Sequence, residues 1–259
     1  MISFRIAGRV FTPRLWPTVM TVLMLAVLLG LGTWQVQRLH WKENLIATID
    51  QRMHQMPVSA ASLADDLARG KDVNYRPGLA IGFLQNDSSF YLFAISQTGE
   101  GGYHILTPMQ MGNGKYLLVD RGWIPYDRKP GTGGGDFSRP TGLVTLKGIL
   151  REPEHFWTQP PNKPKENNWF SIDLPAMAEA ANVPAFLPYV LEADATPNQG
   201  GYPIGGQTRV TLPNNHFVYA VIWYSLALVL LVIYGLSSVQ KKPVHRKTAA
   251  NSTKPKTKA

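Results

Sequence analysis

The stretch LWPTVMTVLMLAVLLGLGTWQVQ, residues 15–37, and the stretch FVYAVIWYSLALVLLVIYGLSSVQ, residues 217–240, decide the architecture of this chain. The first has 23 residues and the second 24, and neither contains Asp, Glu, Lys, Arg or His. An α-helix rises 1.5 Å per residue, so each stretch is long enough to cross the roughly 30 Å hydrocarbon core of a bilayer. The sequence therefore predicts two transmembrane helices, one near each end of the chain.

The charged residues outside these stretches predict the orientation of the chain in the membrane. Residues 1–14 and 241–259 carry ten Lys and Arg and no acid, whereas all 17 Asp and Glu lie between the two stretches, together with 16 Lys and Arg. Because positive charge marks the cytoplasmic side of a membrane protein, we expect both termini to be cytoplasmic and the central segment to lie on the opposite side. The formal net charge of +9 is then a topology signal. We expect the lipid bilayer to be a partner of this protein, and we expect no nucleic-acid partner.

The first stretch is predicted to be a permanent anchor. It is too long for a signal peptide, no small-x-small cleavage site follows it, and a helical pattern continues through WKENLI, residues 41–46, until Pro57. The chain has no cysteine, which excludes disulfides and thiolate metal ligands. A bacterial inner membrane is the simplest location, with the central domain in the periplasm.

Five segments follow from these observations. We expect a basic cytoplasmic tail at residues 1–14, a transmembrane helix at 15–37, a periplasmic domain at 38–215, a second transmembrane helix at 216–240 and a disordered basic tail at 241–259. After Arg76 the sequence alternates with period two in short β-branched and aromatic runs, one pair of which is joined by Gly112-Asn113-Gly114, a good hairpin turn. The expected fold class is a membrane protein with two transmembrane α-helices that flank a β-rich α+β domain. Its expected strands occupy these runs: 76–85, 88–96, 102–111, 115–125, 142–151, 186–193 and 205–212.

Two groups of side chains fall at the outer membrane boundary. Residues three, four and seven apart share a face of a helix, so Trp34, Arg38 and Trp41 line up on the first helix. The second group, on the second helix, contains His216, Tyr219, Ala220 and Trp223. One interpretation is a membrane anchor, because Trp and Tyr form interfacial belts and Arg snorkels to the headgroups. Ala26-x-x-x-Gly30 on the first helix would allow close packing against the second.

The other interpretation of these two groups is a haem site. Neutral imidazole is a good axial ligand for haem iron, aromatic and small residues suit an apolar macrocycle, and a cation suits its propionates. Spacing alone leaves both interpretations open, since there is no CxxCH motif. The remaining histidines have no spacing typical of metal sites and are expected to be structural or solvated: His40, His54, His104, His155 and His245.

We expect no catalytic function. The sequence lacks a G-x-S-x-G elbow, a phosphate loop of the G-x-x-x-x-G-K type and a recognisable pair of carboxylates. Tyr103, Arg121 and Trp123 lie in or beside loops between predicted strands, where aromatic and charged side chains suit partner contact. The Arg-Gly-Trp segment could equally be a strand end packed in the core.

Several segments occur in the order seen in the Surfeit locus protein 1 family, which this sequence resembles from Gly30 to Ala227. These segments are GLGTWQVQR (30–38), WKENLI (41–46), YRP (75–77), GGYHILTP (101–108), LLVDRGWIP (117–125), NNWFSID (167–173) and PIGGQTRVTLPNNHFVYAVIWYSLA (203–227). The resemblance implies a two-helix inner-membrane protein that assists assembly of cytochrome c oxidase, acts on its catalytic subunit and handles haem a.

The resemblance also implies residue roles and partners. The proposed haem ligand of the family falls on His216, and its outer-side aromatic and arginine motif falls on Trp34, Gln35 and Arg38. Haem a synthase is a further partner that such a role implies. Two hypotheses remain: an assembly factor that holds haem a, and a non-haem structural chaperone that stabilises an intermediate of an oxidase subunit.

Overall fold

The structure is a computed structural model, and it describes residues 4–6, 9–96, 98–132, 136–154, 158–208 and 212–241. The chain divides into two units: Met1–Asn44 with Pro213–Ala259, and Leu45–Leu212. The first unit contains the helices at the two ends of the chain, and the second contains the β-rich domain. Each unit is described by itself.

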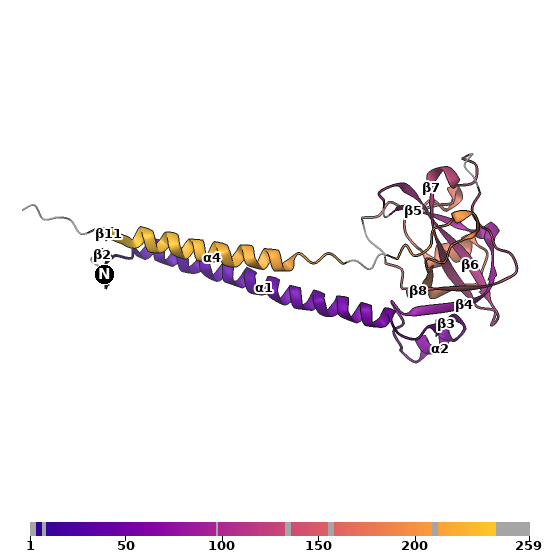
Figure 1. The fold of residues 1–259 in the computed structure, drawn as a ribbon, viewed down its shortest axis with the longest axis horizontal. Helices are drawn as coiled ribbons and strands as arrows, with labels where there is room; N and C mark the ends of the chain where they lie inside the picture. The colour runs from indigo at the N-terminus through magenta and orange to yellow at the C-terminus, as the bar shows by residue number, and fades with distance from the viewer. Residues whose placement is uncertain are drawn as a thin grey trace, which may run out of the picture. The chain divides into compact units, whose positions relative to one another are not determined.

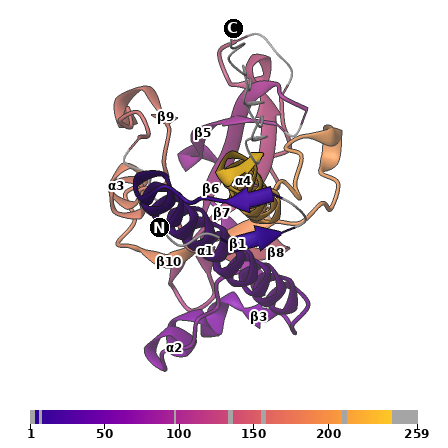
Figure 2. The same cartoon turned by 90° about the vertical axis from the view of Figure 1, so that its left-hand side faces the viewer.

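Two long helices, α1 (Leu15–Met53) and α4 (His216–Ser238), make up most of the first unit. They lie side by side and run antiparallel (Figures 1 and 2). Two hydroxyl pairs join them: Thr18 Oγ1 lies 2.6 Å from Tyr234 Oη, and Thr33 Oγ1 lies 3.2 Å from Tyr224 Oη. The first helix extends well beyond residue 37 and ends before Pro57, as predicted.

Both helices are long and apolar enough to cross a membrane. Only 11% of the most apolar window of each helix is buried, whereas a core helix of a soluble protein would be mostly buried. Large apolar side chains are exposed along both helices, and they include Leu23, Val27, Val229 and Ile233. Such helices bury these surfaces in lipid rather than in protein.

The packing of the two helices corrects one prediction. Gly30 has nothing within 4 Å of the position that a Cβ would occupy, so the Ala26-x-x-x-Gly30 pair does not make the close contact. That contact is at Gly32, where a Cβ would lie 2.9 Å from Cε1 of Tyr224. The prediction was wrong because a small-residue pattern does not say which face of the helix meets the partner.

Three short strands lie at the end of the helix pair where α1 begins and α4 ends (Figure 1). These are β1 (Phe4–Ile6), β2 (Arg9–Phe11) and β11 (Val239–Lys241), paired antiparallel in the order β1-β2-β11. They fall within or next to the two tails expected from the sequence. The rest of the expected disordered tail, residues 242–259, lies outside the described residues.

The second unit is a sheet-rich domain with two short α-helices, so the predicted fold class is confirmed. Its elements are β3 (Val58–Ser59), α2 (Leu63–Ala68), β4 (Pro77–Leu84), β5 (Phe90–Ile95), β6 (Gly101–Met111), β7 (Tyr116–Pro125), β8 (Leu143–Arg151), β9 (Asn168–Trp169), α3 (Leu174–Ala180) and β10 (Phe186–Ala193). Six of the seven predicted strand runs are strands in the structure. The seventh, 205–212, is wrong for its described residues 205–208 and 212, and residues 209–211 lie outside the description.

The sheet of this domain closes into a barrel. The strand order is β3-β4-β8-β10-β7-β6-β5-β9, and β4 also pairs with β6, so β4, β8, β10, β7 and β6 form a closed ring. The pairing of β10 with β7 is parallel, and the other pairings within the ring are antiparallel. Closure satisfies the strand edges of this ring and leaves an interior that side chains can fill.

Apolar side chains fill the barrel and cover part of its outer surface. The interior core includes Ala80, Met109, Leu117, Val119, Leu150 and Leu191. On the outside, α3 packs Met177 against Trp169 and Val190. That helix begins at Asp173, whose Oδ1 accepts a hydrogen bond from Ala176 N at 3.1 Å, which is the cap that the sequence predicts.

Candidate functional site

The first candidate group lies on α1, where one cation sits between two indole rings. Cζ of Arg38 is 5.8 Å from the ring centre of Trp34 and 5.3 Å from that of Trp41. Both distances are within the range of cation–π attraction. The three side chains are exposed, so the group presents a positive charge framed by aromatic surface.

The second candidate group begins at His216, the first residue of α4. Its Nδ1 lies 2.7 Å from Oε1 of Gln35 on α1. An amide oxygen only accepts hydrogen bonds, so Nδ1 carries the proton and donates it. In a neutral imidazole the other nitrogen, Nε2, then keeps its lone pair. A hydrogen bond to the far ring nitrogen is the usual way in which proteins orient a metal-ligating histidine.

The residues that follow His216 on its face of α4 differ in burial. Ala220 is buried, Tyr219 is exposed and Trp223 is half-buried. Nε1 of Trp223 is shielded from solvent and has no hydrogen-bond partner among the described residues. An indole N–H usually finds an acceptor when it is buried, so this donor is available to an acceptor that the chain does not supply.

Gln35 brings the two groups together. It follows Trp34 on α1 and precedes Arg38 by three residues. Its side chain accepts the hydrogen bond from His216 of α4. The predicted residues of both helices therefore gather at one end of the helix pair. The arrangement can offer one imidazole nitrogen to a metal and a guanidinium with aromatic rings to an anionic, flat ligand.

The predicted contact residues of the sheet domain are buried. Arg121 and Trp123 are each 3% exposed, and Tyr103 is 8% exposed. Trp123 pairs with Ile204 through backbone hydrogen bonds of 2.9 and 2.8 Å. The Arg-Gly-Trp segment is thus part of β7 packed in the core, the second of the two interpretations considered from the sequence. Arg121 is also one of the residues that line a cavity.

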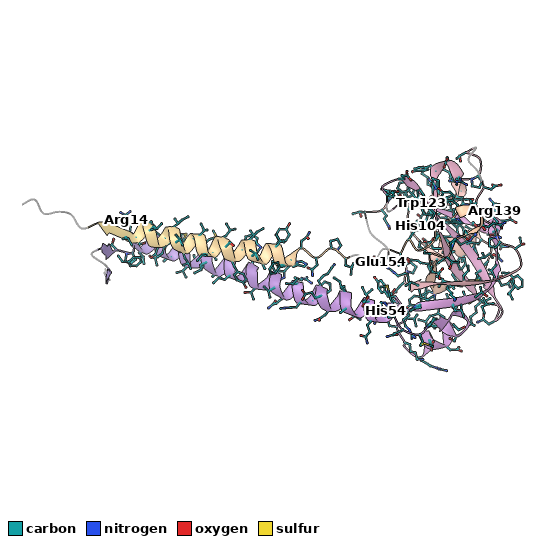
Figure 3. The ribbon with its side chains drawn as sticks, in the orientation of Figure 1. Arg14, His54, His104, Trp123, Arg139 and Glu154 are labelled. Atoms are coloured by element: carbon teal, nitrogen blue, oxygen red, sulfur yellow. The ribbon has the colours of Figure 1, made fainter. Side chains whose placement is uncertain are left out.

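One polar pair in the domain was missed by the spacing analysis. His104 on β6 is labelled in Figure 3. Its Nδ1 lies 2.6 Å from Oδ2 of Asp120 on β7, and both side chains are largely buried. Asp120 Oδ1 also accepts from Gly122 N at 2.9 Å. The sequence feature that could have revealed this pair is the predicted turn at residues 112–114. This turn sets the register of the β6–β7 hairpin, which brings residues 104 and 120 close together.

A third ionisable group, Glu192 on β10, lies beside this pair. It is the register partner of Asp120 across the parallel β10–β7 pairing. Burial raises the pKa of the Glu192 carboxyl, and the negative charge of Asp120 raises it further. The described residues contain no group of three or more His, Asp or Glu that could hold a metal ion.

The other histidines have ordinary surroundings where they are described. His40 is exposed on α1. His54 Nδ1 lies 2.8 Å from the backbone oxygen of Asp50 and 3.7 Å from its Oδ1. His155 and His245 lie outside the described residues.

Comparison with known proteins gives consistent matches. The model of the SURF1 family matches residues 22–228. Surfeit locus protein 1 of Mus musculus is 33% identical over 241 residues, which cover 86% of this chain and 76% of the mouse protein. The human protein of the same name is 35% identical over 216 residues, 76% of this chain and 69% of its own. The SURF1-like protein of Drosophila melanogaster is 32% identical over 248 residues, with coverages of 86% and 77%.

Proposed function

This chain belongs to the SURF1 family, and we propose from this that it is a membrane-anchored assembly factor for cytochrome c oxidase with no catalytic site of its own. The family match and the two apolar helices support this proposal. In the proposed role the protein resides in a bacterial inner membrane with a periplasmic domain. It acts on the catalytic subunit of the oxidase, complex IV of the respiratory chain, and receives haem a from haem a synthase.

The finer proposal is that the protein holds haem a at the outer end of the helix pair. The observation that carries it is the 2.7 Å hydrogen bond between His216 Nδ1 and Gln35 Oε1. This bond fixes the tautomer in which Nε2 can coordinate iron, as in other metal-ligating histidines. When bound, haem a would supply the iron and the redox chemistry that the oxidase needs.

The remaining residues fit the same ligand. Arg38 would neutralise propionates, while Trp34, Tyr219 and Trp223 would contact the macrocycle, and the unpaired Nε1 of Trp223 would donate to a polar substituent. All of these residues bind, orient or shield. None of them is proposed to take part in bond making beyond the coordination by His216.

The alternative role is a non-haem structural chaperone for an oxidase subunit. Under this alternative the bond between Gln35 and His216 only packs two helices, and the aromatic residues form an interfacial belt. The two roles differ in one measurable property, which is the haem content of the protein.

The test is the absorption spectrum of the full-length protein purified in detergent from cells that make haem a. The wild-type protein should carry haem a, and His216→Ala should lose it while remaining folded, because Ala suits the start of a helix. His216→Met should retain weak binding with a shifted spectrum, since a thioether also ligates haem iron. His40→Ala, which removes an exposed imidazole from α1, is the matched control and should keep its haem. If His216→Ala carries as much haem a as the wild type, with the same spectrum, His216 is not the haem ligand; a wild-type protein that carries no haem a would support the structural-chaperone role.

A further inference from the structure

A buried cation, Arg121, lies on strand β7 of the barrel. Leu117 and Val119 on β7 belong to the interior core, and Arg121 follows at the same two-residue spacing. The pairing of β7 with β6 is irregular here, because Asp120 pairs with Leu106 and Trp123 pairs with His104. Arg121 lies within this irregular stretch and is 3% exposed.

Among the described residues, two neutral oxygens accept hydrogen bonds from this guanidinium. Nη2 of Arg121 donates to the backbone oxygen of Ser138 at 2.6 Å, and Nη1 donates to Oδ1 of Asn86 at 3.4 Å. A guanidinium has five N–H donors. Among the described residues no carboxylate forms an ion pair with Arg121. The residues outside the description contain no Asp or Glu in their sequence.

The charge of Arg121 is therefore poorly compensated within the chain. Burial, together with the positive charge of Arg139, lowers the pKa of the Arg121 guanidinium from its usual range to about 10. The group still stays protonated at neutral pH. Burying a cation without an anionic partner costs free energy. An anion bound from outside the chain would offset this cost.

A cavity of about 260 Å³ lies beside this cation. Its wall includes Arg121, Lys147 and the polar side chains of Thr145 and Asn198, so it offers two cations and further hydrogen-bonding groups. Asp194 is also in the wall, but its Oδ1 accepts from Thr196 N at 3.0 Å. The volume is just below the range of pockets that hold drug-sized ligands, which suits a small group.

We propose that this cavity binds a carboxylate group on a short aliphatic stem, with Arg121 as its charged partner and Lys147 as a second cation. The two oxygens of a carboxylate match the planar donors of a guanidinium, which favours this anion over a spherical one. The carboxylate belongs either to a free small acid or to an acidic side chain of a docked protein. The site lies in the sheet domain, and the carboxylate proposal does not depend on the haem proposal.

The test measures thermal unfolding and binding heat of the full-length protein in detergent micelles. Sodium acetate and sodium succinate are compared with sodium chloride at equal ionic strength. The carboxylates should raise the unfolding midpoint of the wild type beyond the effect of chloride, because a ligand of the folded state stabilises it. Arg121→Gln should weaken carboxylate binding on the order of tenfold or more, as expected for loss of a charge-assisted hydrogen bond.

Arg139→Gln is the matched control. It removes one positive charge from an exposed loop residue that does not line the cavity, so carboxylate binding should change far less than in Arg121→Gln. Lys147 is at an exposed position of β8, so Lys147→Gln tests the cavity without disturbing buried residues. It should weaken carboxylate binding severalfold. This variant keeps the proposal testable if Arg121→Gln does not fold.

A second arm separates the two sources of the carboxylate. A capped Gly-Glu-Gly peptide carries its only carboxylate on a side chain, and the capped Gly-Gln-Gly peptide is its neutral counterpart. Binding of the Glu peptide assigns the site to a partner's side chain, whereas binding of succinate alone assigns it to a free acid. If no carboxylate affects the wild-type protein more than chloride does, or if Arg121→Gln and Lys147→Gln both bind as the wild type does, the proposal is wrong.

Discussion

At the scale of single residues, Gly122 is the position on β7 where a side chain would be least tolerated. Its φ is +116°, a left-handed value that favours glycine, and a Cβ there would overlap the backbone oxygen of Ile204. Gly122 N also donates to Asp120 Oδ1 at 2.9 Å. The glycine therefore lets the 203–206 segment approach β7 while Arg121 and Trp123 on either side stay buried.

Gly122→Ala should destabilise the domain by about 2 kcal/mol or more, because it adds both backbone strain and a steric overlap. The unfolding midpoint of the full-length protein in detergent should fall by about 4–8 °C. Gly131→Ala is the matched control, since Gly131 has a φ of +92° and nothing within 4 Å of its Cβ position. It should show only the cost of the strain, about 1 kcal/mol. Equal midpoints for the two variants would mean that the close approach to Ile204 has no role.

Glu192 gives the domain a pH-dependent stability. Burial, and then the charge of Asp120, raises the pKa of this carboxyl in the folded state above its usual value of 4.5. The folded protein consequently holds the proton more tightly than the unfolded chain does. The resulting stabilisation is fully present below the unfolded pKa, and it is lost as pH rises through the folded pKa.

Glu192→Gln should remove this dependence, because the amide is neutral and can still accept the hydrogen bond from Thr208. Relative to the wild type, the variant should have a higher unfolding midpoint at pH 8 and nearly the same midpoint at pH 4. Midpoints measured from pH 4 to pH 8 in detergent check this, with the exposed Glu179→Gln as control. A variant that is less stable than the wild type at pH 8 would contradict the prediction.

At the scale of elements, local signals predicted the strands and long-range contacts decided their arrangement. The β6–β7 hairpin follows from its turn, in which Gly114 has a φ of +75° and Asn113 Oδ1 accepts from Lys115 N at 3.0 Å. Closure of the barrel depends on the pairing of β4 with β6 and of β10 with β7. These strands are separated by many residues, so periodicity and turn residues carry no information on which of them pair.

The helix pair shows the same division between local and long-range information. Length and lack of charge predicted both helices, and i, i+3, i+4 spacing predicted the shared face of Trp34, Arg38 and Trp41. The partner of His216 could not be derived in this way, because Gln35 lies on the other helix. Only the relative rotation of the two helices brings these side chains together, and that rotation is set where Gly32 meets Tyr224.

Gly32→Leu should therefore separate the helices, whereas Gly30→Leu should not. A side chain at residue 32 would collide with the ring of Tyr224, and one at residue 30 would enter open space. Because the chain has no cysteine, Thr18→Cys with Tyr234→Cys gives an unambiguous reporter for a short bismaleimide crosslinker. Crosslinking should fall severalfold in Gly32→Leu and stay unchanged in Gly30→Leu. Equal yields in the two backgrounds would show that Gly32 is not the contact that holds the helices together.

At the scale of the whole molecule, two independent observations support the prediction that both chain ends lie on one side of the membrane. The tails carry ten Lys and Arg and no acid. The helices run antiparallel, and Thr12 N donates to Ser238 O at 2.8 Å where α1 begins and α4 ends. If both helices cross the bilayer, the segment between them must lie on the other side, and the positive-inside rule then makes the tails cytoplasmic.

Single cysteines introduced into this cysteine-free chain test the orientation without a fusion partner. Lys115→Cys lies in the exposed turn between β6 and β7, and Lys247→Cys lies in the basic C-terminal segment. A maleimide that does not cross the inner membrane should label Lys115→Cys in bacterial cells with a permeable outer membrane, and it should label Lys247→Cys only after the inner membrane is opened. Equal labelling of both variants in detergent controls for thiol reactivity. Labelling of Lys247→Cys alone in intact cells would invert the orientation, and the sheet domain would then lie on the cytoplasmic side.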